Sequence, residues 1–125
     1  MILAVLLSLT AAIIEVESGG DNNAVGDGGK ALGCLQIHKA YFKDAQEFDK
    51  SLEKYTYQDV RRRDVAIKVF NAYISRYCTE KRLGRKPTDE DRARCHNSGP
   101  NWFKKMSCTD GYWAKVKKAM KKGKR

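Results

Sequence analysis

The chain has 125 residues, a formal net charge of +10 at pH 7 and 42% hydrophobic residues. This length fits one domain, residues 1–125, with a real but modest core, and the composition excludes a disordered protein. The positive charge predicts an anionic partner such as nucleic acid, acidic lipid or bacterial cell wall. The sequence contains no nucleic-acid-binding motif, no zinc-ligand spacing and no Gly-rich phosphate loop.

Residues 2–14 are uncharged and mostly apolar. A bilayer span needs about 20 such residues, so this stretch forms either a core helix or the apolar part of a secretion signal. A signal would carry a basic segment after Met1, and cleavage after Ala11 or Ala12 would remove most of the helix that precedes Glu17. We therefore favour a core helix.

The apolar spacing of this helix continues to Glu17. Steps of three and four residues put this acid on the apolar face, one turn after Ile13 and Ile14, whereas Glu15 belongs to another face. Apolar neighbours disfavour a charged carboxyl group, and so does the negative end of a helix that stops at Gly19. Glu17 is therefore a candidate general acid. The alternative is a solvated acid at a frayed helix end.

A second carboxylate, Asp27, lies in a turn with Gly26, Gly28 and Gly29. An Asp in such a turn commonly bonds its own backbone, which is the purely structural interpretation. The functional interpretation places Asp27 across a cleft from Glu17, in a wetter environment where it stays ionised. One protonated acid and one carboxylate are the equipment for cleaving a glycosidic bond.

The elements after residue 20 are a small irregular β-hairpin followed mainly by helices. We expect the hairpin within 21–37 and a connection over 49–58. The longest helix should run over 59–81 and carry a wide apolar stripe. The helix expected over 38–48 should have four residues on its apolar face: Tyr41, Phe42, Ala45 and Phe48.

Two more helices complete the expected fold. Thr88, followed by three acids, should cap a helix that ends near 97–100. The last helix should begin near Asp110 and turn an apolar stripe that includes Trp113 toward the core. It should end in a basic tail at 121–125.

Cys34, Cys78, Cys95 and Cys108 are an even number of cysteines in a small basic chain. This predicts an oxidising compartment and two disulfides. Of the three possible pairings we favour Cys78–Cys95, because it would tie the long helix to the next one. The alternative is four buried thiols in a cytosolic protein.

Several motifs carry a family resemblance. ESGG at 17–20, NAVGD at 23–27 and LQI at 35–37 look like the catalytic segment of the lysozyme and lytic-transglycosylase superfamily. In the same order along the chain, YFKD at 41–44, ARCHNSGP at 93–100 and GYW at 111–113 resemble invertebrate-type (i-type, destabilase-like) lysozymes. The resemblance covers nearly the whole chain, although i-type lysozymes are denser in cysteine.

The resemblance implies an α+β, mainly α, lysozyme-like fold with a small β-hairpin beside a substrate cleft. It implies a secreted, bacteriolytic glycosidase, a muramidase that hydrolyses the β-1,4 bond between N-acetylmuramic acid and N-acetylglucosamine. Glu17 would protonate the leaving oxygen, and Asp27 would attack the anomeric carbon or stabilise positive charge there. The side chains expected to hold the sugar are Gln36, Ile37, Tyr41, His96, Asn97, Gly99 and Tyr112.

The expected partner is bacterial peptidoglycan or a chitin-type oligosaccharide, bound by a monomer that has no membrane span and no specific nucleic-acid target. This chemistry needs no metal and no organic cofactor. Some i-type relatives also cleave isopeptide bonds with a Ser and a Lys. The Ser expected before Cys34 is missing here, so we do not expect that activity.

Two other functions stay open. A lytic transglycosylase cleaves the same bond, keeps the acid, lacks the second carboxylate and makes an anhydro product. Asp27 favours hydrolysis, although its alignment with the i-type catalytic Asp needs a one-residue gap. A non-enzymatic cationic protein would instead bind cell walls or harm membranes through its basic C-terminal helix.

Overall fold

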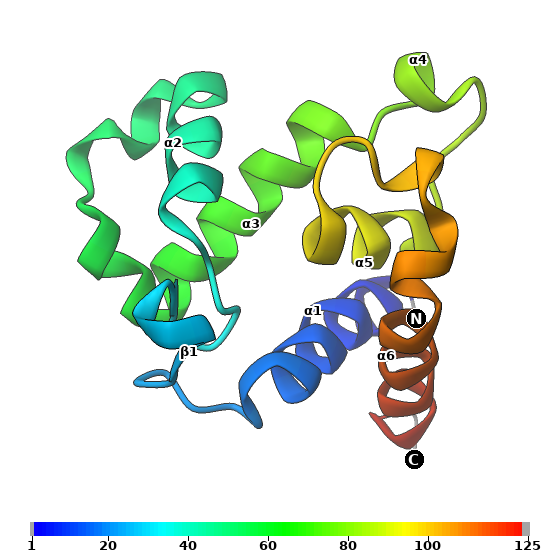
Figure 1. The fold of residues 1–125 in the computed structure, drawn as a ribbon, viewed down its shortest axis with the longest axis horizontal. Coiled ribbons are helices and arrows are strands. Elements are labelled where there is room, and N and C mark those ends of the chain that lie inside the picture. The colour runs from blue at the N-terminus through cyan, green and yellow to red at the C-terminus, as the bar shows by residue number, and fades with distance from the viewer. Residues whose placement is uncertain (1, 124–125) are drawn as a thin grey trace. The chain divides into compact units, whose positions relative to one another are not determined.

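A computed structural model describes the backbone of residues 2–123 and the side chains of residues 9–122. Helices make up most of the described chain (Figure 1). The α-helices are α1 (Ile2–Ser18), α2 (Lys39–Phe48), α3 (Arg63–Tyr77), α4 (Glu80–Leu83), α5 (Asp89–Ser98) and α6 (Asp110–Gly123). The strands are β1 (Val25–Gly26) and β2 (Ala31–Leu32), and the 3₁₀ helices are η1 (Asp27–Gly29), η2 (Lys50–Lys54), η3 (Tyr57–Arg61), η4 (Trp102–Lys104) and η5 (Met106–Thr109).

Residue contacts divide the chain into two units, which we name by their place in the sequence. The terminal unit comprises Met1–Val16 and Tyr77–Arg125, and the middle unit comprises Glu17–Arg76. The helix α1 therefore begins in the terminal unit and ends in the middle unit, at Glu17 and Ser18. The prediction of one domain over 1–125 stays a prediction.

The helix predicted before Glu17 is present as α1. The choice of a core helix over a signal stays a prediction. On its apolar face Leu9, Ala12, Ile13 and Ile14 are buried, and Glu15 is exposed. Residues 2–8 belong to the helix backbone, but their side chains lie outside the described residues.

The middle unit contains the predicted hairpin. Its strands β1 and β2 are antiparallel, with Val25 opposite Leu32 and Gly26 opposite Ala31, and η1 forms the turn between them. Leu32 also bridges to Ile37, so the chain folds back once more before α2 begins. The hairpin lies beside the N-terminal end of α3 (Figure 1).

Apolar side chains of the middle unit are buried in α2, in α3 and in the segment that follows β2. The side chains of Leu35, Ile37, Phe42, Val65 and Val69 are buried there. Phe48 is an exception to the face predicted for α2, because its side chain is about half exposed at the end of the helix. The prediction for Phe48 was therefore wrong, while Phe42 and Ala45 are buried as expected.

The longest predicted helix, 59–81, is broken into three pieces. Thr56 and Asp59 form a capping box that starts the 3₁₀ helix η3, and Arg62 is extended, so α3 begins only at Arg63. At the other end Thr79 is extended and caps a separate short helix, α4, which ends at Gly84 in the left-handed conformation. The capping residues thus divide this stretch into separate helices, although its apolar spacing would allow one continuous helix. The correction also makes α1 longer than α3.

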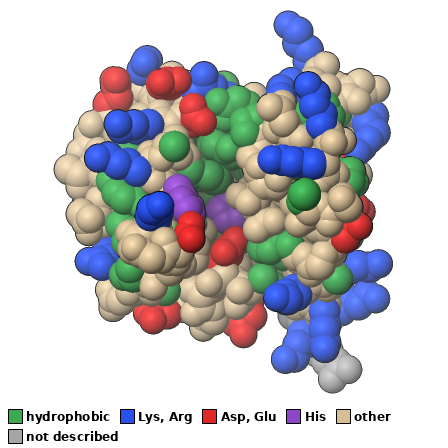
Figure 2. All heavy atoms as spheres, viewed as in Figure 1, with side chains coloured by type: hydrophobic (Ala, Val, Ile, Leu, Met, Phe, Trp, Pro, Cys, Tyr) green, Lys and Arg blue, Asp and Glu red, His purple; other side chains and the backbone are tan. Residues whose placement is uncertain are grey.

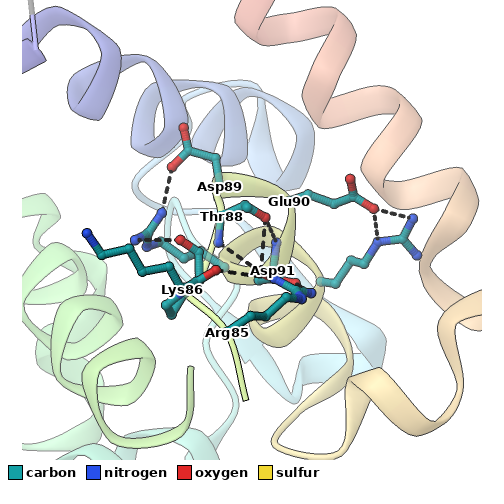
Figure 3. A network of polar contacts seen from close by, with 9 residues as sticks. Arg85, Lys86, Thr88, Asp89, Glu90 and Asp91 are labelled. Carbon is teal, nitrogen blue, oxygen red and sulfur yellow. Dashed lines mark hydrogen bonds and ion pairs between the residues drawn. The ribbon is translucent and has the colours of Figure 1, made fainter. Parts of the chain in front are cut away.

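In the terminal unit, a polar network fixes the start of α5. Thr88 caps the helix as predicted: its hydroxyl accepts from the backbone N–H of Asp91, and the Asp91 carboxylate accepts from Thr88 N at 2.8 Å. Both Arg85 guanidinium nitrogens donate to the same carboxylate, with Nη2 at 2.8 Å from Oδ1. Figure 3 shows these three side chains pointing toward one another at the helix terminus.

The helices α5 and α6 pack together in the terminal unit, with η4 and η5 between them in the chain. The buried Arg94 joins them, because it donates from Nε to Glu90 at 3.0 Å and from Nη1 to Asp110 at 2.8 Å. Of the apolar stripe predicted for α6, Val116 is fully buried, whereas Trp113, Ala119 and Met120 are only partly buried. The lysines of α6 are exposed, as expected. Lys124 and Arg125 of the predicted tail lie outside the described residues.

Candidate functional site

Glu17 occupies the last turn of α1, one turn after the buried Ile13 and Ile14, and its own side chain is partly exposed. The next residue, Ser18, donates its hydroxyl to the carbonyl of Cys34 at 2.8 Å and accepts from the backbone N–H of Gly20 at 3.2 Å. The end of the helix is therefore bound to the segment after β2. Glu17 sits on a fixed helix terminus at the rim of an apolar face.

Asp27 begins the turn between the two strands. Its φ is +52°, a left-handed conformation that residues other than glycine adopt rarely. Gly28 and Gly29 follow with φ of +64° and +94°. The carboxylate oxygen Oδ2 lies 3.2 Å from Nε2 of His38, and the side chain of His38 is 49% exposed and that of Asp27 65% exposed. The structure therefore gives Asp27 a side-chain partner from the start of α2.

The loop between Glu17 and Asp27 is held by Arg63 at the start of α3. Its Nη2 donates to the carbonyl of Gly20 at 2.6 Å, and its Nε donates to the side chain of Asn22 at 3.1 Å. Both candidate carboxylates thus flank a segment that is anchored to a helix of the same unit.

The side chain of Gln36 binds the two sides of the hairpin to each other. Its side-chain amide Nε2 donates to the carbonyl of Gly33 at 2.9 Å and to that of Ala24 at 3.3 Å. Gly33 has a φ of +80°, and a Cβ there would collide with the backbone carbonyl of Val60. Gln36 therefore already holds the hairpin together, in addition to its predicted contact with sugar.

Ile37 and Tyr41 also lie in the middle unit. The Ile37 side chain is fully buried, so it supports the site by packing and presents no surface to a saccharide. The Tyr41 ring is partly exposed and stacks on Tyr73, with ring centroids 3.7 Å apart and planes 9° from parallel. One face of Tyr41 is therefore occupied by Tyr73.

The four remaining predicted sugar contacts belong to the terminal unit. His96 is buried in α5, Asn97 is exposed in its last turn, and Gly99 ends this helix with a φ of +97°. Tyr112 is partly exposed near the start of α6. Their contact with a saccharide stays a prediction.

The four cysteines are free thiols, so the predicted disulfides, Cys78–Cys95 included, are absent from the structure. Cys34, Cys78 and Cys95 are buried, whereas Cys108 is exposed. Burial raises the pKa of Cys78 to about 11 and that of Cys95 to about 12, because an apolar surrounding disfavours the thiolate. The three buried cysteines act as packing residues, as in the alternative interpretation, but the exposed Cys108 departs from its four buried thiols.

Residues 9–119 match the Destabilase family. The chain belongs to this family. The matched range contains Glu17 and Asp27 and nearly all of the described elements. The resemblance to i-type, destabilase-like lysozymes is thereby confirmed, and the family includes lysozyme-type glycoside hydrolases.

This destabilase-family chain is also similar to a chain in the crystal structure of Aeromonas hydrophila PliI in complex with Meretrix lusoria lysozyme. The two chains are 30% identical and superimpose with a TM-score of 0.72, over 89% of this chain and 87% of that one. No curated protein matches the chain. The mainly helical, lysozyme-like α+β fold predicted from the sequence is confirmed.

The sequence interpretation did not single out two residues that support the candidate site in this destabilase-family chain. His38 was only the first residue of the helix expected over 38–48, and Arg63 was only part of the helix expected over 59–81. The one available signal for His38 was a histidine directly after the LQI motif.

Within the described residues no helix has the length and apolarity to cross a membrane, and no three His, Cys, Asp or Glu side chains gather as a metal site.

Proposed function

We propose that this chain is a muramidase that hydrolyses the β-1,4 bond between N-acetylmuramic acid and N-acetylglucosamine in peptidoglycan. The observation that carries the proposal is the family match over the segment that holds Glu17 and Asp27. Support comes from the placement of the two acids, one on a helix end beside apolar residues and the other on an exposed, wetter turn. A pair of carboxyl groups in unlike environments suits glycosidic cleavage.

In the proposed mechanism Glu17 donates its proton to the leaving glycosidic oxygen as the bond to the anomeric carbon breaks. The Asp27 carboxylate bonds to that carbon, or stabilises its positive charge. A water molecule then loses a proton to Glu17, and its oxygen bonds to the anomeric carbon as any bond from that carbon to Asp27 breaks. Glu17 is thereby protonated again and Asp27 is again a free carboxylate. The tyrosine, glutamine and terminal-unit residues named above remain the proposed sugar contacts.

Secretion and a bacterial cell-wall partner are parts of the same proposal. The sequence argument for secretion rested on paired cysteines and on the expected target. Because the thiols are free in the structure, secretion now rests on the target alone.

Mass spectrometry of digested peptidoglycan tests the proposal. A hydrolase leaves muropeptides with a reducing N-acetylmuramic acid end, and that product is expected. A lytic transglycosylase would leave the anhydro sugar, which is lighter by one water. Intact glycan after prolonged digestion with a folded protein would exclude both enzymes.

A non-enzymatic cationic protein is the second candidate, and the charge of α6 favours it. Figure 2 shows Lys side chains, in blue, gathered at the C-terminal part of this helix. The exposed lysines of α6 are Lys115, Lys117, Lys118, Lys121 and Lys122. As solvated charges they would attract an anionic wall over about 8 Å at physiological ionic strength.

Removal of 121–125 separates the two candidates. A muramidase should lose lysis of whole cells at low salt but keep its cleavage of a short, uncharged chitin-type oligosaccharide. A purely cationic protein should cleave no oligosaccharide in either form and should lose its killing with the tail. Equal loss on both substrates would mean that the tail belongs to the fold or the site.

A further inference from the structure

The contact between Asp27 and His38 joins two segments that the hairpin brings together. Asp27 opens the turn η1, and His38 stands directly before the first residue of α2. Nε2 of the imidazole lies 3.2 Å from Oδ2 of the carboxylate. His38 makes no side-chain cap bond to its own helix, so the ring serves Asp27 and not the helix terminus.

Asp27 is on a backbone that needs outside support. Its positive φ, followed by two glycines that also have positive φ, describes a turn with few intrinsic restraints on the carboxylate. Non-glycine residues in this conformation persist only where their surroundings hold them, and they cluster at functional sites. An Asp that must meet a reacting carbon therefore requires anchors for both backbone and side chain.

The backbone anchor is the hydroxyl of Tyr57. It lies 3.1 Å from the carbonyl of Lys30, at the end of the Asp27 turn, and 2.7 Å from the carbonyl of Ile37, the residue before His38. One phenol from η3 thus holds the two segments that carry the Asp27–His38 pair. A tyrosine hydroxyl is protonated at neutral pH and can donate, and burial raises the pKa of Tyr57 further.

We propose that His38 is a positioning residue for Asp27. Its Nε2–H, present in one neutral tautomer and in the charged ring, donates to Oδ2 and fixes the plane of the carboxylate. The other oxygen, Oδ1, is then the one that meets the anomeric carbon. The inference rests on the proposed muramidase function for its chemical purpose, but the contact itself can be tested without activity.

Kinetics of the purified full chain on a chitin-type oligosaccharide test the role. His38→Ala should lower kcat about tenfold, the value of one hydrogen bond to a charged group, and should change KM less than twofold. His38→Gln keeps an N–H donor of similar reach and should recover most of the loss. Lys39→Ala, at the exposed neighbouring position, is the matched control and should leave both constants unchanged.

The dependence on Asp27 is tested in a second background. If His38 acts through Asp27, His38→Ala should not lower kcat any further in a protein that already carries Asp27→Asn. An equal loss in both backgrounds, or a loss confined to KM, would overturn the inference. Thermal midpoints of all variants should stay close to that of the parent protein, which separates positioning from a folding role.

Nitrogen-15 NMR supplies the readout that does not need turnover. The Nε2 resonance of His38 should move on Asp27→Asn, while the resonances of His96, the other histidine of the chain, should not. If the Nε2 resonance of His38 does not shift on Asp27→Asn, the inference is overturned, whatever the activity of the variant. A wild-type protein that shows the contact but cleaves no glycan would instead refute the muramidase proposal, and with it the catalytic purpose given to His38.

Discussion

The guanidinium of Arg63 donates to the carbonyl of Gly20 across 43 positions of sequence, at 2.6 Å. It also holds Asn22, so the start of α3 restrains the loop that separates Glu17 from Asp27. Arg63→Ala should lower cell-wall lysis about tenfold through misplacement of the two acids, with a stability loss of about 1–2 kcal/mol. Arg61→Ala, at an exposed position of η3, is the control. Equal activities of the two variants would show that the loop needs no anchor.

Replacement of Glu17 by Gln tests the proposed acid. The amide keeps the size of the side chain but has no proton to donate, so cleavage should fall by roughly 10²–10⁴-fold. Asp27→Asn should be about as damaging, while Glu15→Gln, on the exposed face of the same helix, should not matter. A folded Glu17→Gln protein with parental activity would exclude Glu17 as the acid.

Thiol titration tests the correction to the cysteines. In the native protein the exposed Cys108 should react quickly, and Cys34, Cys78 and Cys95 slowly, because burial raises the pKa of each of these three thiols. After unfolding without reductant all four should react. Two disulfides would instead leave none to titrate.

The pair Arg85–Asp91 gives a prediction about acid stability. Burial alone would raise the pKa of Asp91, but hydrogen bonds from Arg85 and Thr88 outweigh it and hold this pKa below its ordinary value of 3.8. A depressed pKa in the folded state means that the stabilisation is complete above that ordinary value and is lost as the pH falls below it. Asp91→Asn should therefore reduce the free energy of unfolding at pH 7 by about 2–3 kcal/mol. The free energy of unfolding of this variant should also fall less steeply as the pH is lowered.

Asp89→Asn is the matched control for this measurement. Asp89 pairs with Arg92 at 3.0 Å one turn further along α5, but both side chains are partly exposed. Such pairs contribute at most about 1 kcal/mol. Chemical denaturation between neutral and acid pH would contradict the argument if the two variants lost the same stability.

Gly33 provides a backbone test of the hairpin. Gly33→Ala combines a strained positive φ with a collision against the Val60 carbonyl, and should destabilise the protein by about 2–4 kcal/mol. Gly29→Ala has a similar φ but open space around its new Cβ, and should cost only about 1–2 kcal/mol. If the two variants are equally stable, the close approach of Gly33 to Val60 does not exist in solution.

Local signals in the sequence predicted much of the fold. The apolar period placed Glu17 at the end of α1, Thr88 with its following acids predicted the start of α5, and α6 begins at Asp110 as expected. These features depend on residues within one or two turns of each other. The break in the long helix was missed because Thr56 and Asp59 were not recognised as a capping box.

The candidate site was predicted only in part, because its supports are distant in sequence. The carboxylates could be chosen from their local surroundings. Neither the His38 partner of Asp27 nor the Arg63 anchor of Gly20 has a periodic or spacing signal, since each depends on how the hairpin meets a helix. The disulfide prediction failed for another reason. An even number of cysteines is typical of disulfide pairing, but cysteines are also common as unpaired residues in a packed core.

The distribution of tryptophan makes the two units optically different. Both tryptophans of the chain, the buried Trp102 and the partly exposed Trp113, belong to the terminal unit, and Glu17, Asp27 and His38 belong to a unit with none. Emission excited at the red edge of the indole absorption therefore follows the terminal unit alone. A saccharide that changes this emission must touch or shift that unit. A saccharide that is cleaved without changing it is handled by the middle unit.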